Sequence, residues 1–114
     1  YNLVPLVQQK LQQQNLQSRV HAFGYGHLGD GNLHLNVVCD EAIDEVTEIL
    51  EPYVFEFAVE NGGSISAEHG IGQHKRAYMS LQKTAPTLKL MASIKRMFDP
   101  KGILNPNKVI PEGY

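Results

Sequence analysis

Apolar and polar side chains alternate along two stretches in the first third of the chain, which is the pattern of half-buried β-strands. In residues 19–25, small apolar residues alternate with histidine and aromatic residues. In residues 32–38, aliphatic residues fall on one face, and His34 and Asn36 fall on the other. The sequence between them, GHLGDGN, contains three glycines and an Asp-Gly pair, which favour a tight turn. We therefore predict a β-hairpin.

Three further segments have the apolar spacing of amphipathic helices. Residues 2–17 place leucines in a Gln-rich stretch, and Pro5 suits the first turn of a helix. Residues 41–61 have the clearest 3.6-residue stripe, and residues 86–98 follow Thr84, which is a suitable N-cap. The predicted inner positions are Leu6, Leu11, Leu16, Ile43, Val46, Leu50, Tyr53, Val54, Phe57, Ala58, Leu88, Met91, Ile94 and Phe98.

Proline and glycine indicate where these elements bend or end. Pro52 predicts a kink or a fresh helix start, because it lacks the N–H that a helix interior needs. Asp40 is a candidate N-cap for the long helix, and Gly62 with its neighbouring glycine is expected to end it. A short extension is expected at residues 64–66, and irregular chain over residues 100–114. Together these elements predict an α+β fold.

Composition and charge narrow the class of protein. The 114 residues are 42% hydrophobic and 19% charged, as in a globular domain or part of one. A net charge of -2 gives no basic patch for nucleic acid, and no apolar run is long enough for a transmembrane helix. The single cysteine, Cys39, permits no internal disulfide and no thiolate metal cluster. Because the chain begins at Tyr1 without an initiator Met, we expect it to be a fragment of a longer protein.

Two histidines and one glutamate lie in or beside the glycine-rich turns: His27, His34 and Glu68. Two imidazoles and one carboxylate are a common ligand set for a divalent metal that keeps coordination positions open. On spacing alone this interpretation is evenly balanced against ordinary surface histidines and a solvated loop acid. A hairpin would bring His27 and His34 to one side of the sheet.

Two more residues have candidate roles beside that set. His69 follows Glu68 directly, and an imidazole suits a general base because it titrates near working pH. A loop histidine bonded to the backbone is an equally good interpretation of the spacing. Asn36 shares the strand face of His34 and could hydrogen-bond a ligand.

Three motifs in order resemble the C-terminal domain of FAD-linked oxidases, a group of vanillyl-alcohol-oxidase-type flavoproteins. They are GYGHLGDGNLHLNV from residue 24, SAEHGIG from residue 66 and FDPKGILNP from residue 98. Within the family the resemblance is strongest to the D-2-hydroxyglutarate and D-lactate dehydrogenases. It extends over residues 20–110, and residues 1–17 add nothing to it.

The resemblance implies that residues 1–114 are the C-terminal part of a substrate and metal domain with a ferredoxin-like antiparallel sheet and packed helices. It implies that His27, His34 and Glu68 bind a divalent metal, usually zinc. It also implies that Asn36 and His69 contact substrate, with His69 as the base. Asn105 would approach the flavin of an FAD held mainly by a separate N-terminal domain.

The family's members oxidise D-2-hydroxy acids to 2-oxo acids, so the implied partners are a small 2-hydroxy acid and an electron acceptor, either a protein or a quinone. The implied compartment is mitochondrial in a eukaryote and otherwise cytoplasmic. Because this chain has no FAD-binding domain of its own, we expect it to be inactive in isolation. The alternatives are a non-catalytic metal-binding or protein-interaction module of the same fold, and a non-haem iron oxygenase, which the lack of a β-barrel pattern disfavours.

Overall fold

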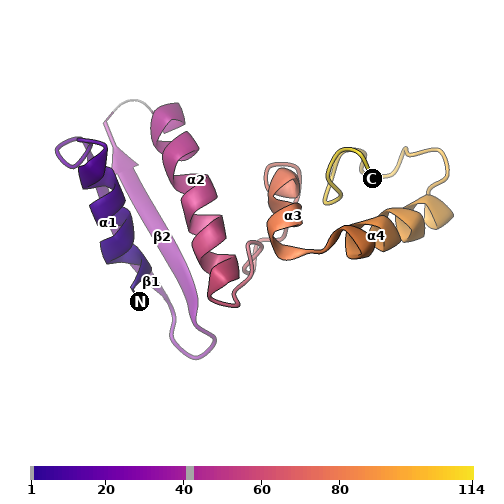
Figure 1. The fold of residues 1–114 in the computed structure, drawn as a ribbon, viewed down its shortest axis with the longest axis horizontal. Coiled ribbons are helices and arrows are strands. Elements are labelled where there is room, and N and C mark those ends of the chain that lie inside the picture. Colours follow the sequence, from indigo (N-terminus) through magenta and orange to yellow (C-terminus); the bar gives the residue numbers. More distant parts are fainter. Residues whose placement is uncertain (1, 41–42) are drawn as a thin grey trace. The chain divides into compact units, whose positions relative to one another are not determined.

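The computed structural model describes residues 2–40 and 43–114, which fall into two units, Tyr1–Val54 and Phe55–Tyr114. The predicted α+β class is confirmed, and Figure 1 follows the chain through its elements. In order, these are α1 (Leu3–Gln13), β1 (Val20–His27), β2 (Asn32–Cys39), α2 (Ile43–Glu60), the 3-10 turn η1 (Arg76–Tyr78), α3 (Met79–Gln82) and α4 (Ala85–Phe98). The elements α1, β1, β2 and α2 follow the order of the middle of a ferredoxin-like β-α-β-β-α-β unit.

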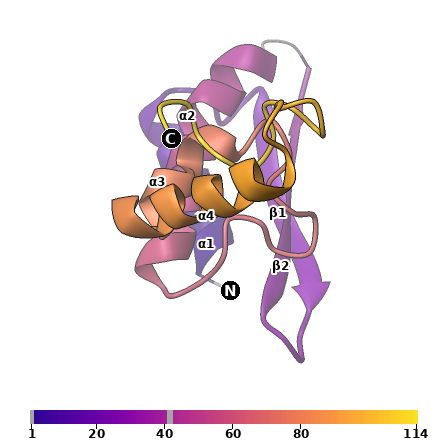
Figure 2. The ribbon, with the colours of Figure 1, turned by 90° about the vertical axis from the view of Figure 1, so that its right-hand side faces the viewer.

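The predicted hairpin is present, and it is longer than the alternation suggested. Strands β1 and β2 pair antiparallel from Val20 opposite Cys39 to His27 opposite Asn32. They lie side by side along their length in Figure 2. The connecting turn is therefore only residues 28–31, whereas the glycines had suggested a turn over residues 26–32. Gly26 is a strand residue because the two backbones approach closely there: a Cβ at Gly26 would lie 2.0 Å from the Asn32 carbonyl oxygen.

Helix α1 packs on the face of β1 that carries small side chains. Val20 and Ala22 are buried, and a Cβ added at Gly24 would lie only 2.7 Å from a methyl carbon of Val4. Gln8 Nε2 also donates to the Ala22 carbonyl at 2.8 Å. The small residues of β1 thus let a helix approach the strand closely.

The buried positions of α1 differ in part from the predicted leucines. Leu11 is buried as predicted, and Leu3 and Val7 join it, whereas Leu6 is only half-buried. Leu16 is buried but lies after the end of the helix, where Leu16 N–H donates to the Leu11 carbonyl. The helix also ends four residues earlier than predicted. Residues four apart share one helix face, as Leu3, Val7 and Leu11 do, whereas leucines five apart do not.

Helix α2 continues through Pro52 without a fresh start. Val46 and Leu50 are buried as predicted, but in the second half the buried aromatic residue is Phe55, and Phe57 is only half-buried. The buried side of the helix changes along its length because Val46 and Leu50 belong to the first unit, whereas Phe55 belongs to the core of the second unit. The predicted cap at Asp40 adjoins residues 41–42, so this prediction falls outside the described residues.

The core of the second unit assembles around Leu88, which is completely buried. Phe55, Ile65 and Met79 pack with it, and partly buried side chains surround this cluster: Val59, Ile71, Tyr78, Met91 and Tyr114. Residues 64–66 were predicted to be extended, but residues 65–69 form turns with Ile65 pointing into the core. Sequence patterns did not reveal η1 and α3, whose combined length is too short for a periodic signal.

Helix α4 is present as predicted, but only two of its four predicted inner side chains point into the core. Thr84 holds the N-cap position, and the helix ends at Phe98 before Asp99 and Pro100. Leu88 is buried and Met91 is half-buried, as predicted. Ile94 and Phe98 were predicted to be inside, yet they are 46% and 80% exposed. The apolar stripe is longer than the core of this chain, because Ala92 is the last buried side chain of the helix.

The revised core predicts which phenylalanine of α2 stabilises the protein. Replacing Phe55 by Ala should lower the free energy of unfolding by about 3–5 kcal/mol, because it leaves a cavity against Leu88. The matched change Phe57→Ala should cost less, about 1–2 kcal/mol, because Phe57 is partly exposed and lies outside the buried cluster around Leu88. Denaturant unfolding of the two variants measures both values. Equal losses at the two positions would show that the core face is wrongly assigned.

Candidate functional site

Five polar or aromatic side chains of interest share one face of the hairpin. In the antiparallel register, Tyr25 lies opposite His34, and Phe23 lies opposite Asn36. His27 is two positions beyond Tyr25 on β1, so its side chain points to the same side. The predicted metal ligands His27 and His34 and the predicted substrate residue Asn36 are therefore on one surface. The opposite face, which bears the small residues of β1, is the one that α1 covers.

Three of the rings on this surface form a row. The His34 ring stacks on Tyr25, with centroids 5.1 Å apart and planes within 5° of parallel. The His27 ring lies 5.2 Å from the His34 ring and is tilted by 43°. The candidate ligand nitrogens of the two histidines lie within 4.8 Å of each other. Two nitrogens bound to one zinc ion at roughly 2.0–2.1 Å each can be at most about 4.2 Å apart, so this spacing is close to that of a shared ion.

Asn36 is half-buried, and its Nδ2 contacts the backbone of its own strand, at 3.4 Å from the His34 carbonyl oxygen. This contact is long for a hydrogen bond. The side-chain amide can therefore turn to a ligand at low cost. It lies on the same face as His34, two residues farther along β2, as the sequence predicted.

The predicted acid and base lie in the second unit, in the turn that follows α2. Glu68 and His69 are adjacent, and His69 Nε2 lies 3.7 Å from Glu68 Oε1. In extended chain neighbouring side chains point in opposite directions, but here Ala67 has φ 44° and Gly70 has φ 79°. This bend brings the carboxylate and the imidazole together. Both side chains are largely open to solvent.

The last residues of the chain hold the segment after this turn. Val109 N–H donates to the Gly72 carbonyl at 2.8 Å, and Arg76 makes an ion pair with Glu112. Lys108 Nζ adds a contact to Gln73 at 3.3 Å. The sequence had suggested only irregular chain after residue 100. Its supporting role could not be foreseen because the contacts span more than 30 residues.

Asn105, the predicted flavin-facing residue, is exposed and has φ 46°. It lies in the segment that follows α4, in the second unit. Asparagine is one of the few residues other than glycine that adopt this backbone conformation readily. The local turn thus fits the residue found there.

Comparison with known proteins identifies the family. The model of the FAD linked oxidases, C-terminal domain, matches residues 1–109. The chain belongs to this family. It is 54% identical over 91 residues to the mitochondrial D-2-hydroxyglutarate dehydrogenase of Arabidopsis thaliana and 52% identical over 91 residues to that of Rattus norvegicus. It is also 46% identical over 91 residues to a D-2-hydroxyglutarate–pyruvate transhydrogenase of Saccharomyces cerevisiae.

These alignments cover 80% of this chain but only 16%, 17% and 18% of the respective relatives. The chain therefore corresponds to less than a fifth of each relative's length. The resemblance noted from the three motifs is confirmed at the level of the family. None of the helices among the described residues has the length and apolar character needed to cross a bilayer.

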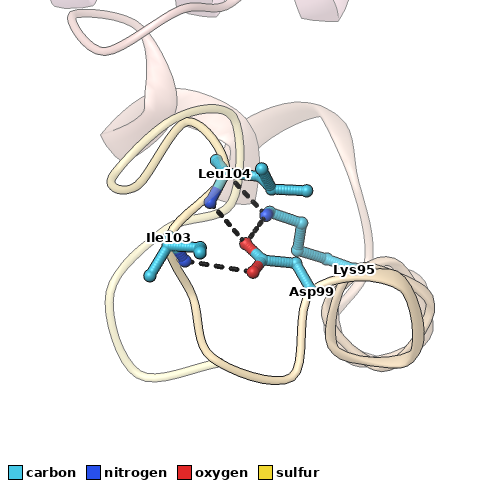
Figure 3. A network of polar contacts seen from close by, with 4 residues as sticks. All are labelled: Lys95, Asp99, Ile103 and Leu104. Atoms are coloured by element: carbon cyan, nitrogen blue, oxygen red, sulfur yellow. Dashed lines mark hydrogen bonds and ion pairs between the residues drawn. The ribbon is translucent and has the colours of Figure 1, made fainter.

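In this FAD-linked oxidase domain, a buried carboxylate organises the turn that leads to Asn105 (Figure 3). Asp99 accepts hydrogen bonds from the Ile103 and Leu104 amides at 3.0 and 2.9 Å, and it pairs with Lys95 one helical turn earlier. Lys95 Nζ also donates to the Leu104 carbonyl at 2.6 Å. The hydrogen bond from Lys95 and the two amide bonds lower the pKa of Asp99 below its ordinary 3.8, although desolvation opposes them.

The lowered pKa of Asp99 predicts a local dependence on pH. Its stabilising effect is fully present above pH 3.8 and is lost as the pH falls through the lower pKa of the folded state. Asp99→Asn should remove the ion pair and loosen the turn at all pH values. The protection factor of the peptide covering residues 99–105, which compares its exchange rate with that of the unfolded peptide at the same pH, should then be lower in the variant and no longer fall in acid. Protection unchanged by Asp99→Asn would contradict the role of the carboxylate.

Proposed function

We propose that this chain is the part of an FAD-dependent D-2-hydroxy-acid dehydrogenase that supplies a divalent metal site and a general base. Membership of the FAD-linked oxidase family is the observation that carries the proposal. It is supported by relatives named as D-2-hydroxyglutarate dehydrogenases in a plant and a mammal. A fission-yeast relative, 42% identical, is named as a putative D-lactate dehydrogenase. The substrate class is therefore D-2-hydroxyglutarate or D-lactate, oxidised to the 2-oxo acid.

The proposed metal ligands are His27, His34 and Glu68. The donor set fits a zinc-like ion, because imidazole nitrogen and carboxylate oxygen are its usual ligands and three of them leave a position for substrate. The hairpin supports the pair of histidines directly, since their rings are neighbours on one face. Glu68 is proposed as the third ligand on the strength of its exposed carboxylate and the family motif.

The proposed base is His69. Its imidazole is exposed, which leaves it accessible to a substrate hydroxyl, and it is adjacent to the proposed ligand Glu68. We propose that His69 Nε2 or Nδ1 accepts the proton of the substrate's 2-hydroxyl. Asn36 orients the substrate by hydrogen bonding through its side-chain amide. When bound, the metal ion would act as a Lewis acid, and FAD would accept the hydride.

The flavin and the electron acceptor would be supplied from outside the residues described. Asn105 is proposed to face the flavin, and turnover is proposed to require the FAD-binding part of the protein. An acceptor protein or a quinone would reoxidise the flavin. The relatives are named as mitochondrial, so in a eukaryotic source we propose the mitochondrion.

The metal proposal predicts the behaviour of three substitutions in the full-length enzyme. His27→Ala, His34→Ala and Glu68→Gln should each lower bound zinc and lower kcat/KM at least about 10²-fold, because a three-ligand site loses a third of its donors. The matched control is His21→Ala, which removes an exposed imidazole from the same strand face. Metal analysis and steady-state kinetics with D-2-hydroxyglutarate and D-lactate measure the effects.

If the three variants retain full metal content, these residues are not its ligands. Metal loss with no turnover by any form of the full-length protein would instead support the non-catalytic metal-binding module.

The base proposal predicts a different pattern for His69. The change His69→Asn should lower kcat by roughly 10²–10⁴-fold, the usual effect of losing a general base, while zinc and FAD stay bound. His74→Asn, an exposed histidine five residues later, serves as the control and should change neither quantity. The measurement is turnover with a dye acceptor alongside the flavin spectrum. Normal turnover by His69→Asn would remove it from the mechanism and leave the metal site unaffected.

A further inference from the structure

Tyr25 occupies a position that the metal ligands themselves do not explain. It is the residue directly opposite His34 in the hairpin, and its ring is parallel to the imidazole within 5°. It is also 63% exposed, so the stack buries little of the tyrosine. A large aromatic side chain left mostly in solvent yet aligned with one imidazole is poorly explained by core packing.

Stacking on Tyr25 restrains the χ2 torsion of His34, which rotates the imidazole ring and so sets the direction in which its ligand nitrogen points. The terminal torsion of a histidine is broad, so packing or hydrogen bonds must fix the ring plane. The lone pair of a ring nitrogen lies in that plane, and an ion bound by two imidazoles must therefore lie in both ring planes. The planes of His27 and His34 are 43° apart, so they cross along a single line. Any rotation of the His34 ring moves this line, and with it the positions at which one ion could lie in both ring planes.

We propose that Tyr25 is a positioning residue that sets the ring plane of His34 for metal binding. The inference rests on the proposed metal site and assigns a role to a residue outside its ligand set. Tyr25 acts through His34 and needs no contact with the ion or the substrate. The aromatic face carries the effect, and the phenol hydroxyl is not required.

The experiment titrates the metal-free full-length protein with Co²⁺ and Zn²⁺, using a chelator to compete for zinc. Tyr25→Phe retains the stack and should bind zinc within about twofold of the wild type. Tyr25→Ala removes it and should bind roughly 10-fold more weakly, the lower end of the effect of losing a residue that orients a ligand. The visible spectrum of bound Co²⁺ should also change in Tyr25→Ala, because the coordination geometry relaxes.

The matched control is Phe23→Ala, which removes an exposed aromatic ring from the same strand face two residues before Tyr25, opposite Asn36. It should leave zinc affinity and the Co²⁺ spectrum unchanged. If Tyr25→Ala fails to fold, Tyr25→Thr keeps a strand-forming side chain without the ring and should give the same weakened binding.

The outcomes separate this inference from the metal site on which it rests. Zinc binding that depends on His27 and His34 but is unchanged in Tyr25→Ala and Tyr25→Thr would overturn the role of Tyr25 alone. Weakened binding in Tyr25→Phe equal to that in Tyr25→Ala would overturn it too, because it would make the hydroxyl responsible. A wild type that binds no metal through His27 and His34 would overturn the metal site and this inference together.

Discussion

The close approach of β1 and β2 at Gly26 is the constraint on which the candidate site depends. Only a residue without a side chain fits there, because a Cβ would lie 2.0 Å from the Asn32 carbonyl oxygen. The observed register thus requires glycine at this position, and a slip of one residue would turn every side chain of a strand to the other face. The observed register puts both imidazoles and Asn36 on one surface and leaves the small residues of β1 to α1. A local packing requirement thus determines which side chains can meet a ligand.

The hairpin could be predicted from sequence because its information is local. The alternation of apolar and polar residues indicates which side chains share a face, and the glycine-rich turn indicates that the two strands pair antiparallel. His27 and His34 were therefore expected on one side before their distance was known. The strand ends were not predictable, because glycine in GHLGDGN signals both a turn and a close backbone approach. Gly26 is needed for the close backbone approach and not for the turn, which only the position of Asn32 on the neighbouring strand reveals.

The helical faces were harder to predict, since periodicity shows an apolar stripe but not what covers it. In α2 the stripe that includes Val46 and Leu50 does not continue to Phe57, because Phe55 joins the separate core around Leu88. In α4 the stripe extends to Phe98, which is 80% exposed here. The last buried side chain of α4 is Ala92, so the apolar stripe extends beyond the part of the helix that this core covers.

The turn that carries Glu68 and His69 shows how backbone strain can serve a site. Ala67 has φ 44°, a left-handed conformation that costs an L-residue about 1–2 kcal/mol. The surrounding contacts offset this cost: Ile65 is anchored in the core, and His69 N–H donates to the Ser66 carbonyl at 2.9 Å. A relaxed, extended backbone would point the two neighbouring side chains to opposite sides. The strained turn instead keeps the Glu68 carboxylate and the His69 imidazole 3.7 Å apart, the two groups for which a ligand role and a base role are proposed.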